Sequence, residues 1–246
     1  MTNRLAPTIF GPLFLIAAWE SVARSGIAGL TVPLPAQVAR IYLEPHFASL
    51  LWRSSLSTGQ SALSGLVFGA SLGILTALVS HVIPPLRPGL DRLAATINAI
   101  PAVALGPIFI LLVSRDLTPS LLSTIAVYFL IYVAVSSGLR NASAKLLAMM
   151  TTFGAGKWQR LRYLEIPSAL PAFLGGVKIS VTAAMIGALV GEWFGAPTGL
   201  GIVILNTMQN FQVPLMWAAV LLAAGMSLAG YGVAHLAEKA IARRFL

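Results

Sequence analysis

Cysteine is absent from this sequence, and charged residues and histidines are scarce. Without cysteine the chain has no disulfide, no thiolate metal site and no Cys nucleophile. Its three histidines, His46, His81 and His235, lie far apart and form no H-E-x-x-H pair, so we expect no metal site. Only 9% of the 246 residues are charged and 57% are hydrophobic, whereas soluble domains are about 25% charged. The composition therefore predicts an integral membrane protein.

Motifs of catalysis and nucleotide binding are missing as well. The stretch "GAGKW" contains a Gly-Lys pair, but Trp158 replaces the Ser or Thr of a P-loop and no glycine stands at position 151. No G-x-S-x-G nucleophile motif occurs. We therefore expect no catalytic residue and no cofactor in this chain.

Long apolar runs indicate about six transmembrane helices, because a helix needs about 20 mostly apolar residues to cross a bilayer. The first run lacks a clean A-x-A-like cleavage site, so we interpret it as a retained anchor helix. We predict an all-α membrane protein. The six runs are about Pro7–Ala28, Leu56–Ile83, Leu90–Val113, Pro119–Gly138, Leu170–Trp193 and Leu215–Leu236.

Basic residues outnumber acidic ones by 16 to 7, which in a soluble protein could indicate nucleic-acid binding. In a membrane protein, Lys and Arg gather in cytoplasmic loops. With a cytoplasmic N-terminus and six spans, most basic residues fall on the cytoplasmic side. We therefore predict a multi-pass protein of the cell inner membrane, with both termini cytoplasmic and no nucleic-acid partner.

The same topology divides the chain in two. Residues 1–54 would hold the first transmembrane helix and an external segment that can form an interfacial helix. Residues 55–246 would form the core, with a cytoplasmic loop at 139–169.

Loop 139–169 contains a compact basic and aromatic segment. Gly154 and Gly156 permit a sharp turn, and "KWQRLRYL" can then restart a helix that places Trp158 and Tyr163 among three basic residues. Aromatic side chains beside Arg are common in docking surfaces. The alternative is a basic loop that lies on anionic lipid.

The spacing in this loop resembles the cytoplasmic motif of the membrane subunits of ATP-binding-cassette (ABC) importers, E-A-A-x-x-x-G, nine residues, then I-x-L-P. Gly154 takes the glycine place, Leu164 and Ile166 the aliphatic places, and Pro167 the proline. "AMM" at 148–150 stands where E-A-A is expected, so the motif glutamate is missing. "INAIPAVALGPIFIL", "GKWQRLRYLEIPSALPAFLGGVKIS" and "VGEWFGAPTGLGIVIL" resemble segments of the nitrate, sulfonate and taurine permeases.

The resemblance implies a type I ABC importer permease fold, with a coupling helix in the loop that docks on an ATPase. It also implies alternating access: two permease subunits, identical or homologous, line the pathway, an ATPase dimer binds ATP and Mg²⁺, and an external binding protein delivers a small solute. The residues implied in ATPase coupling are Ala148, Gly154, Ala155, Gly156, Lys157, Trp158, Gln159, Arg160 and Pro167.

Gly65, Gly69 and Gly73 repeat every four residues and form one smooth helix face. Within lipid, close packing drives helix association, so this face predicts a tight helix contact. Its partner could be another span of this chain, which we favour, or a second permease.

The predicted pathway or gate residues are Asn98, Pro101, Met185, Glu192 and Trp193. The third span is interrupted near mid-depth, which is typical of a broken helix along a transport pathway or of a kinked packing helix. Glu192 is an ionisable residue late in a span, and such residues are functional candidates. The alternative is a carboxylate hydrated at the external interface.

Two other function classes deserve comparison. A membrane-embedded enzyme would need ionisable residues that converge at one depth, and those of this chain are scattered. An ion-coupled secondary transporter would show inverted repeats and paired intramembrane acids, and we find neither. Among the scattered groups, we expect Lys178 to extend toward the cytoplasm and Glu20 to be paired or interfacial.

Overall fold

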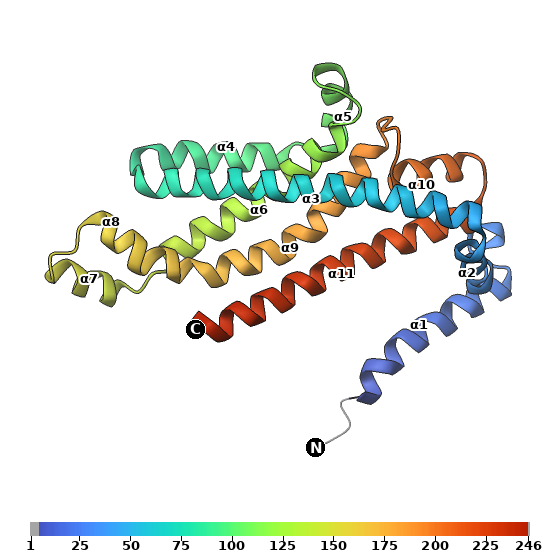
Figure 1. Cartoon of the computed structure of the whole chain (residues 1–246), viewed down its shortest axis with the longest axis horizontal. Coiled ribbons are helices and arrows are strands. Elements are labelled where there is room, and N and C mark those ends of the chain that lie inside the picture. Colours follow the sequence, from blue (N-terminus) through green and yellow to red (C-terminus); the bar gives the residue numbers. More distant parts are fainter. Residues whose placement is uncertain (1–4, 246) are drawn as a thin grey trace.

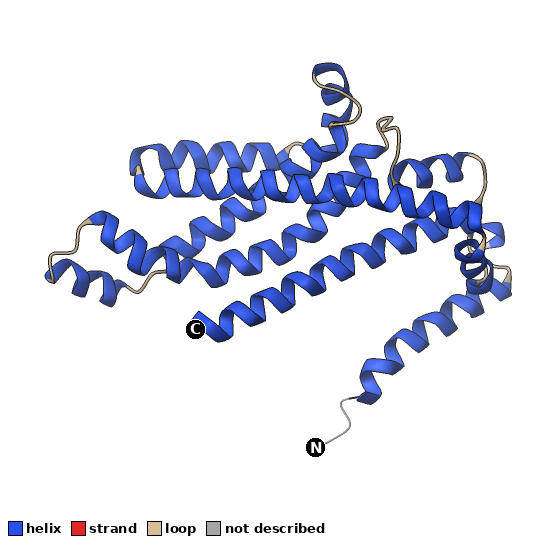
Figure 2. Cartoon of the chain, in the orientation of Figure 1, coloured by secondary structure: helices blue, strands red, loops and turns tan. Residues whose placement is uncertain are grey.

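The computed structural model describes residues 5–245, and within that range the chain is helical without strands (Figures 1 and 2). This confirms the all-α prediction. The α-helices are α1 (Leu5–Ser25), α2 (Pro35–Leu43), α3 (Pro45–Val82), α4 (Arg87–Ala99), α5 (Ala102–Leu112), α6 (Thr118–Arg140), α7 (Ala144–Thr152), α8 (Lys157–Arg160), α9 (Ile166–Glu192), α10 (Leu200–Gln209) and α11 (Val213–Phe245). Single 3-10 turns lie at Gly29–Thr31 (η1) and Pro84–Leu86 (η2), and a π-helical turn at Leu161–Glu165 (η3) joins α8 to α9.

Four helical stretches in the described part of the chain are long and apolar enough to cross a membrane. They are Pro45–Val82, Thr118–Arg140, Lys157–Glu192 and Val213–Ile241, and the pair α4–α5 makes a fifth if it is counted as one bent span. The first predicted span falls on α1, where the side chains of residues 5–10 and 12 lie outside the described part. The structure thus supports a multi-pass membrane protein, while the number six stays a prediction.

Two predicted spans begin at least four residues after the start of the helices that contain them. Helix α3 starts at Pro45 rather than near Leu56, because a proline fits the first turn of a helix and no breaker follows it. Helix α9 starts at Ile166 with Pro167 in its first turn. The predicted boundary between residues 54 and 55 falls within α3, and the division into two parts stays a prediction.

The third predicted span is not one straight helix. Helices α4 and α5 meet at an angle of 94°. Ile100 adopts an extended conformation (ψ 122°), as residues before proline do, and Pro101 has no N–H for a helical hydrogen bond. The structure therefore has a break where the sequence predicted one, and the place of this break along a transport pathway stays a prediction.

Helix α6 lies between α3 and α9 and forms the centre of the bundle (Figure 1). Its fully buried side chains include Leu122, Val127 and Ile131. Gly65, Gly69 and Gly73 of α3 all face α6.

A Cβ atom on any of these glycines would collide with α6. At Gly69 it would lie 2.6 Å from the carbonyl oxygen of Thr124, and at Gly73 it would lie 2.8 Å from that of Tyr128. The glycine face therefore packs on another helix of the same chain.

Helix α9 approaches the other side of α6 in the same way. A Cβ on Gly187 would lie 2.7 Å from the Cα of Ser123, and one on Gly191 would collide with Pro119. Small residues at a four-residue interval thus bring both neighbours into backbone contact with α6.

An ion pair joins α9 to α11. The Lys178 Nζ lies 2.6 Å from a carboxylate oxygen of Glu238, which is also 3.4 Å from the His235 ring. A carboxylate on the adjacent helix thus holds the ammonium, and the expected extension of Lys178 toward the cytoplasm stays a prediction. Glu20 is paired, as the sequence allowed, with Arg24 at 2.6 Å.

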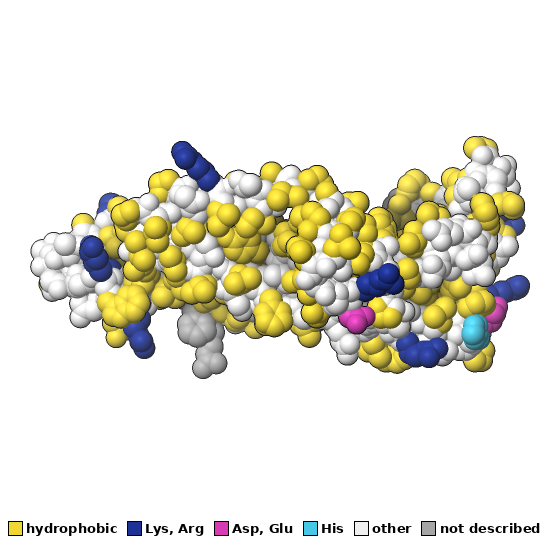
Figure 3. All heavy atoms as spheres, turned by 90° about the horizontal axis from the view of Figure 1, so that it is seen from above, with side chains coloured by type: hydrophobic (Ala, Val, Ile, Leu, Met, Phe, Trp, Pro, Cys, Tyr) yellow, Lys and Arg dark blue, Asp and Glu magenta, His cyan; other side chains and the backbone are white. Residues whose placement is uncertain are grey.

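The N-terminal part packs on the start of α11. The Tyr42 hydroxyl donates to the Ala218 carbonyl at 2.7 Å, and Trp19 stacks on Trp217 with ring centroids 5.2 Å apart. In Figure 3 a band without charged side chains, largely hydrophobic, separates two groups of charged residues on the visible face. This distribution suits a molecule surrounded by lipid between two polar ends.

Replacing Gly69 with Ala tests the contact between α3 and α6. We expect Gly69→Ala to destabilise the protein by about 1–3 kcal/mol, because the methyl group overpacks a rigid backbone contact. Thermal unfolding of the purified chain in detergent measures this. Gly175→Ala is the control, since no atom lies within 4 Å of a Cβ there. Equal unfolding temperatures for both variants would contradict the packing account.

Candidate functional site

Loop 139–169 projects from one end of the bundle, between α6 and α9 (Figure 1). Helix α7 begins after Ser143, whose hydroxyl accepts a hydrogen bond from the Leu146 N–H at 3.5 Å. None of the α7 residues is buried. The helix therefore presents its surface to the surroundings instead of adding to the bundle core.

Gly154 provides the turn after α7. Its φ is +79°, a left-handed conformation that non-glycine residues rarely adopt, and the next N–H, of Ala155, donates to the Met150 carbonyl at 2.9 Å. Gly156 has an ordinary φ of −67°. Of the two glycines in the predicted turn, only Gly154 has a backbone conformation that favours glycine.

Helix α8 restarts directly after Gly156. The Gln159 side chain accepts the Gly156 N–H at 2.8 Å, and Arg160 donates to the Thr151 hydroxyl at 3.1 Å. Two predicted coupling residues, Gln159 and Arg160, therefore fix the geometry of the turn. Lys157 is exposed.

Three aromatic side chains near this turn are exposed: Phe153 at 82%, Trp158 at 75% and Tyr163 at 68%. The guanidinium of Arg162 lies 6.0 Å from the Tyr163 ring centroid. We call Phe153, Trp158 and Tyr163 the aromatic surface. Ala148 is exposed on α7, as is Pro167 at the start of α9.

A side-chain contact that the sequence did not predict anchors the loop to the bundle. The Nε2 of His81, at the end of α3, lies 2.8 Å from the carboxylate of Glu165 in η3. Leu161 in the same turn is buried. The two residues are 84 positions apart in the sequence, and no local pattern predicts their contact.

Glu192, a predicted gate residue, is fully buried at the end of α9. One carboxylate oxygen accepts the Gly201 N–H at 2.6 Å, in the first turn of α10. Gly199 packs so closely on the carboxyl group that a Cβ there would collide with it. A carboxylate at a helix N-terminus is favourable, so Glu192 supports the turn into α10. It is not the hydrated interfacial carboxylate that the sequence also allowed.

The other predicted pathway residues occupy different surroundings. Asn98 and Pro101 are exposed at the break between α4 and α5, and Trp193 is half exposed after α9. Met185 is buried and lines an apolar cavity of about 410 Å³ between α3, α9 and α11, together with Met226. In the single chain these side chains thus do not line one common cavity.

Over residues 5–245, no group of three or more His, Asp or Glu side chains is placed to hold a metal ion.

Comparison with known proteins identifies the class. The profile of the family described as "Binding-protein-dependent transport system inner membrane component" matches residues 45–246. The riboflavin transport system permease protein RibX of Chloroflexus aurantiacus is 32% identical over 94% of this chain and 87% of its own. The formylaminopyrimidine transport permease protein ThiX of Halalkalibacterium halodurans is 31% identical over 92% and 90%.

A solved structure agrees on the fold. A chain of the MetNI methionine ABC transporter, in an inward-facing conformation, matches with a TM-score of 0.62 at 18% identity, covering 79% of this chain and 95% of that one. The chain belongs to the family of binding-protein-dependent transport system inner membrane components. It is the permease subunit of an ABC importer, with the type I permease fold, and a multi-pass protein of the inner membrane. This places it outside the two rival classes, membrane enzyme and ion-coupled transporter.

Replacing Glu192 tests whether its carboxyl group stabilises the start of α10. In Glu192→Ala the buried Gly201 N–H loses its acceptor, which we expect to cost about 1–3 kcal/mol of stability. Glu192→Gln keeps an oxygen acceptor of the same size and serves as the control. Thermal unfolding of the purified chain compares the two. An alanine variant as stable as the glutamine variant would contradict the supporting role.

Proposed function

We propose that this permease works by alternating access, driven by a separate ATPase dimer that binds ATP and Mg²⁺, and that loop 139–169 is where the ATPase docks. The observation that carries this proposal is the aromatic surface. Exposed aromatic side chains beside cationic ones are typical of protein interfaces, where they become buried in pockets of the partner. Here they lie on a loop whose own turn is fixed by Gly154, Gln159 and Arg160.

The proposed orientation places this end of the bundle in the cytoplasm, together with both termini. Five basic residues in loop 139–169 support it, since Lys and Arg gather on the cytoplasmic side of membrane proteins. A second permease, identical or homologous, and an external solute-binding protein complete the proposed assembly. The five residues are Arg140, Lys145, Lys157, Arg160 and Arg162.

The solute is proposed to be a small organic molecule. Relatives with similar coverage are named for riboflavin, formylaminopyrimidine and aliphatic sulfonates, which differ in charge and size. In the proposed pathway the apolar wall with Met185 between α3, α9 and α11 contributes one side. The exposed break at Asn98 and Pro101 is proposed to face the pathway when two permeases assemble.

Co-purification tests the partner directly. The tagged chain, expressed with ABC ATPase subunits from the same organism, is expected to retain one of them through affinity and size-exclusion steps in mild detergent. A chain that never retains a nucleotide-binding subunit would overturn the proposal.

Replacing Trp158 tests the docking surface. Trp158→Ala is expected to reduce solute-stimulated ATPase activity of the assembled complex by about tenfold or more, because truncating a buried aromatic at an interface centre costs at least about 2 kcal/mol. Trp52→Ala on α3 is the matched control, since Trp52 is also exposed, at 65%, but lies far from the loop in sequence. Both variants should be produced in normal amounts. Equal activity in the two would remove the docking role of Trp158.

A further inference from the structure

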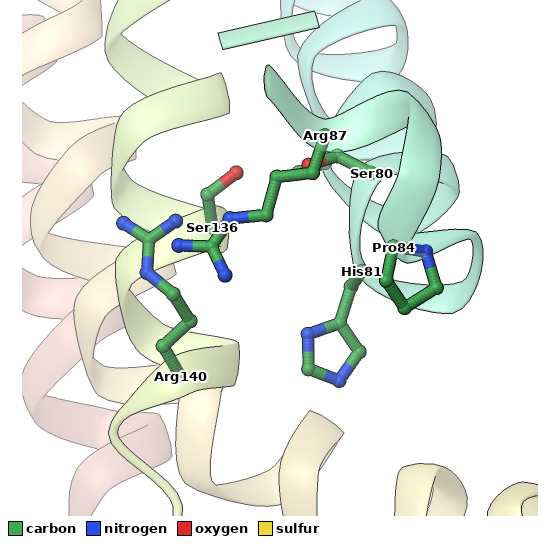
Figure 4. Close-up of a pocket in the computed structure, with 7 residues that line it drawn as sticks. Ser80, His81, Pro84, Arg87, Ser136 and Arg140 are labelled. Atoms are coloured by element: carbon green, nitrogen blue, oxygen red, sulfur yellow. The ribbon is translucent and has the colours of Figure 1, made fainter. Parts of the chain in front are cut away.

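A small polar cavity lies beside the loop, between α3, α4 and α6. It has a volume of about 170 Å³. Its lining includes Ser80 and His81 of α3, Arg87 of α4, and Ser136 and Arg140 of α6. Figure 4 shows the Arg87 and Arg140 side chains extending toward each other from opposite walls, with Ser136 beside them.

The floor of the cavity is made of buried hydroxyl groups. Ser80 and Ser136 are 3% and 5% exposed. The Ser80 hydroxyl is 3.5 Å from the Tyr132 hydroxyl, whereas the Ser136 Oγ has no hydrogen-bond partner among the described residues. A buried hydroxyl without a partner costs free energy, so a ligand acceptor at Ser136 would remove that cost.

The charges around the cavity leave a positive excess. Arg140 makes no side-chain hydrogen bond or ion pair within residues 5–245, and Arg87 lies 3.6 Å from Asp91, a long contact. Asp91 also accepts the Tyr132 hydroxyl. His81 is already paired with Glu165. Two guanidinium groups that face one space repel each other unless an anion lies between them.

We propose that this cavity binds the phosphate group of an anionic ligand, either a phospholipid headgroup or free phosphate. Guanidinium groups bind phosphate through paired N–H···O bonds, and the serine hydroxyls can donate to its remaining oxygens. The cavity opens where α3 and α6 end, and basic pockets at such positions between transmembrane helices suit headgroups. Arg87 and Arg140 hold the anion, and Ser136 orients it.

The site also lies next to the loop. His81 lines this cavity and a second one formed with Trp158, Arg160 and Glu165. Only the His81 side chain therefore separates an anion at Arg140 from the turn at α8. Binding of the anion is in this way connected to the position of the loop.

Two binding measurements on the purified full chain separate the two sources of phosphate. The first compares thermal unfolding in sodium phosphate with unfolding in sodium chloride at equal ionic strength. The second uses native mass spectrometry to compare adducts of phosphatidylglycerol and phosphatidylcholine. We expect Arg140→Gln to weaken anion binding by about tenfold or more, since a hydrogen bond to a charged group contributes about 1.5–3 kcal/mol.

Two further variants make the result specific. Ser136→Ala removes only the hydroxyl without a partner, so it should fold normally and still weaken anion binding. Arg92→Gln is the control, because Arg92 is exposed on α4 and does not line the cavity. Phosphatidylglycerol adducts that require Arg140 and Ser136, without stabilisation by phosphate, identify a lipid headgroup. Stabilisation by phosphate with the same requirement, without a lipid preference, identifies free phosphate.

Two outcomes would overturn the proposal. One is equal anion binding in wild type, Arg140→Gln and Ser136→Ala. An equal loss of binding in Arg92→Gln counts the same, because it would indicate an effect of general surface charge only. The other is a loss of the ATPase subunit in Arg140→Gln with both anion measurements unchanged, which would assign the arginine to a protein carboxylate.

Discussion

Backbone contact between α6 and its two neighbours is the constraint on which the rest of the structure depends. In lipid, apolar side chains gain little by leaving the solvent, so helices associate through close packing and hydrogen bonds. Gly69 and Gly73 on α3 and Gly187 on α9 bring these helices to van der Waals contact with the α6 backbone. No larger side chain fits at these positions, so they set how closely both helices approach α6.

The ends of these helices position loop 139–169. His81 lies at the end of α3, and Glu165 lies in the turn before α9. The hydrogen bond between their side chains connects the bundle to loop 139–169. Gly154 turns the loop back on itself, so that Trp158 projects outward. In the proposed mechanism, a force applied by the ATPase at Trp158 reaches both helices through this short path.

Local sequence signals predicted the parts that depend on one residue or one spacing. The glycine repeat predicted the α3 contact, Pro101 predicted the break after α4, and Gly154 predicted the turn. Contacts between residues far apart in the sequence have no such local pattern, because they depend on tertiary packing. The pairing of His81 with Glu165 and the burial of Glu192 under α10 are of this kind. The 94° angle at the break likewise depends on what α4 and α5 pack against.

The central claim is that the surface around Trp158 contacts an ATPase, and site-specific cross-linking tests it most directly. Because the chain has no cysteine, Trp158→Cys provides a single attachment point for a photoreactive label. In the assembled complex this label is expected to cross-link to the ATPase subunit, and one attached through Trp52→Cys is not. Cross-links from position 158 that reach only lipid, or that occur equally from position 52, would contradict the account.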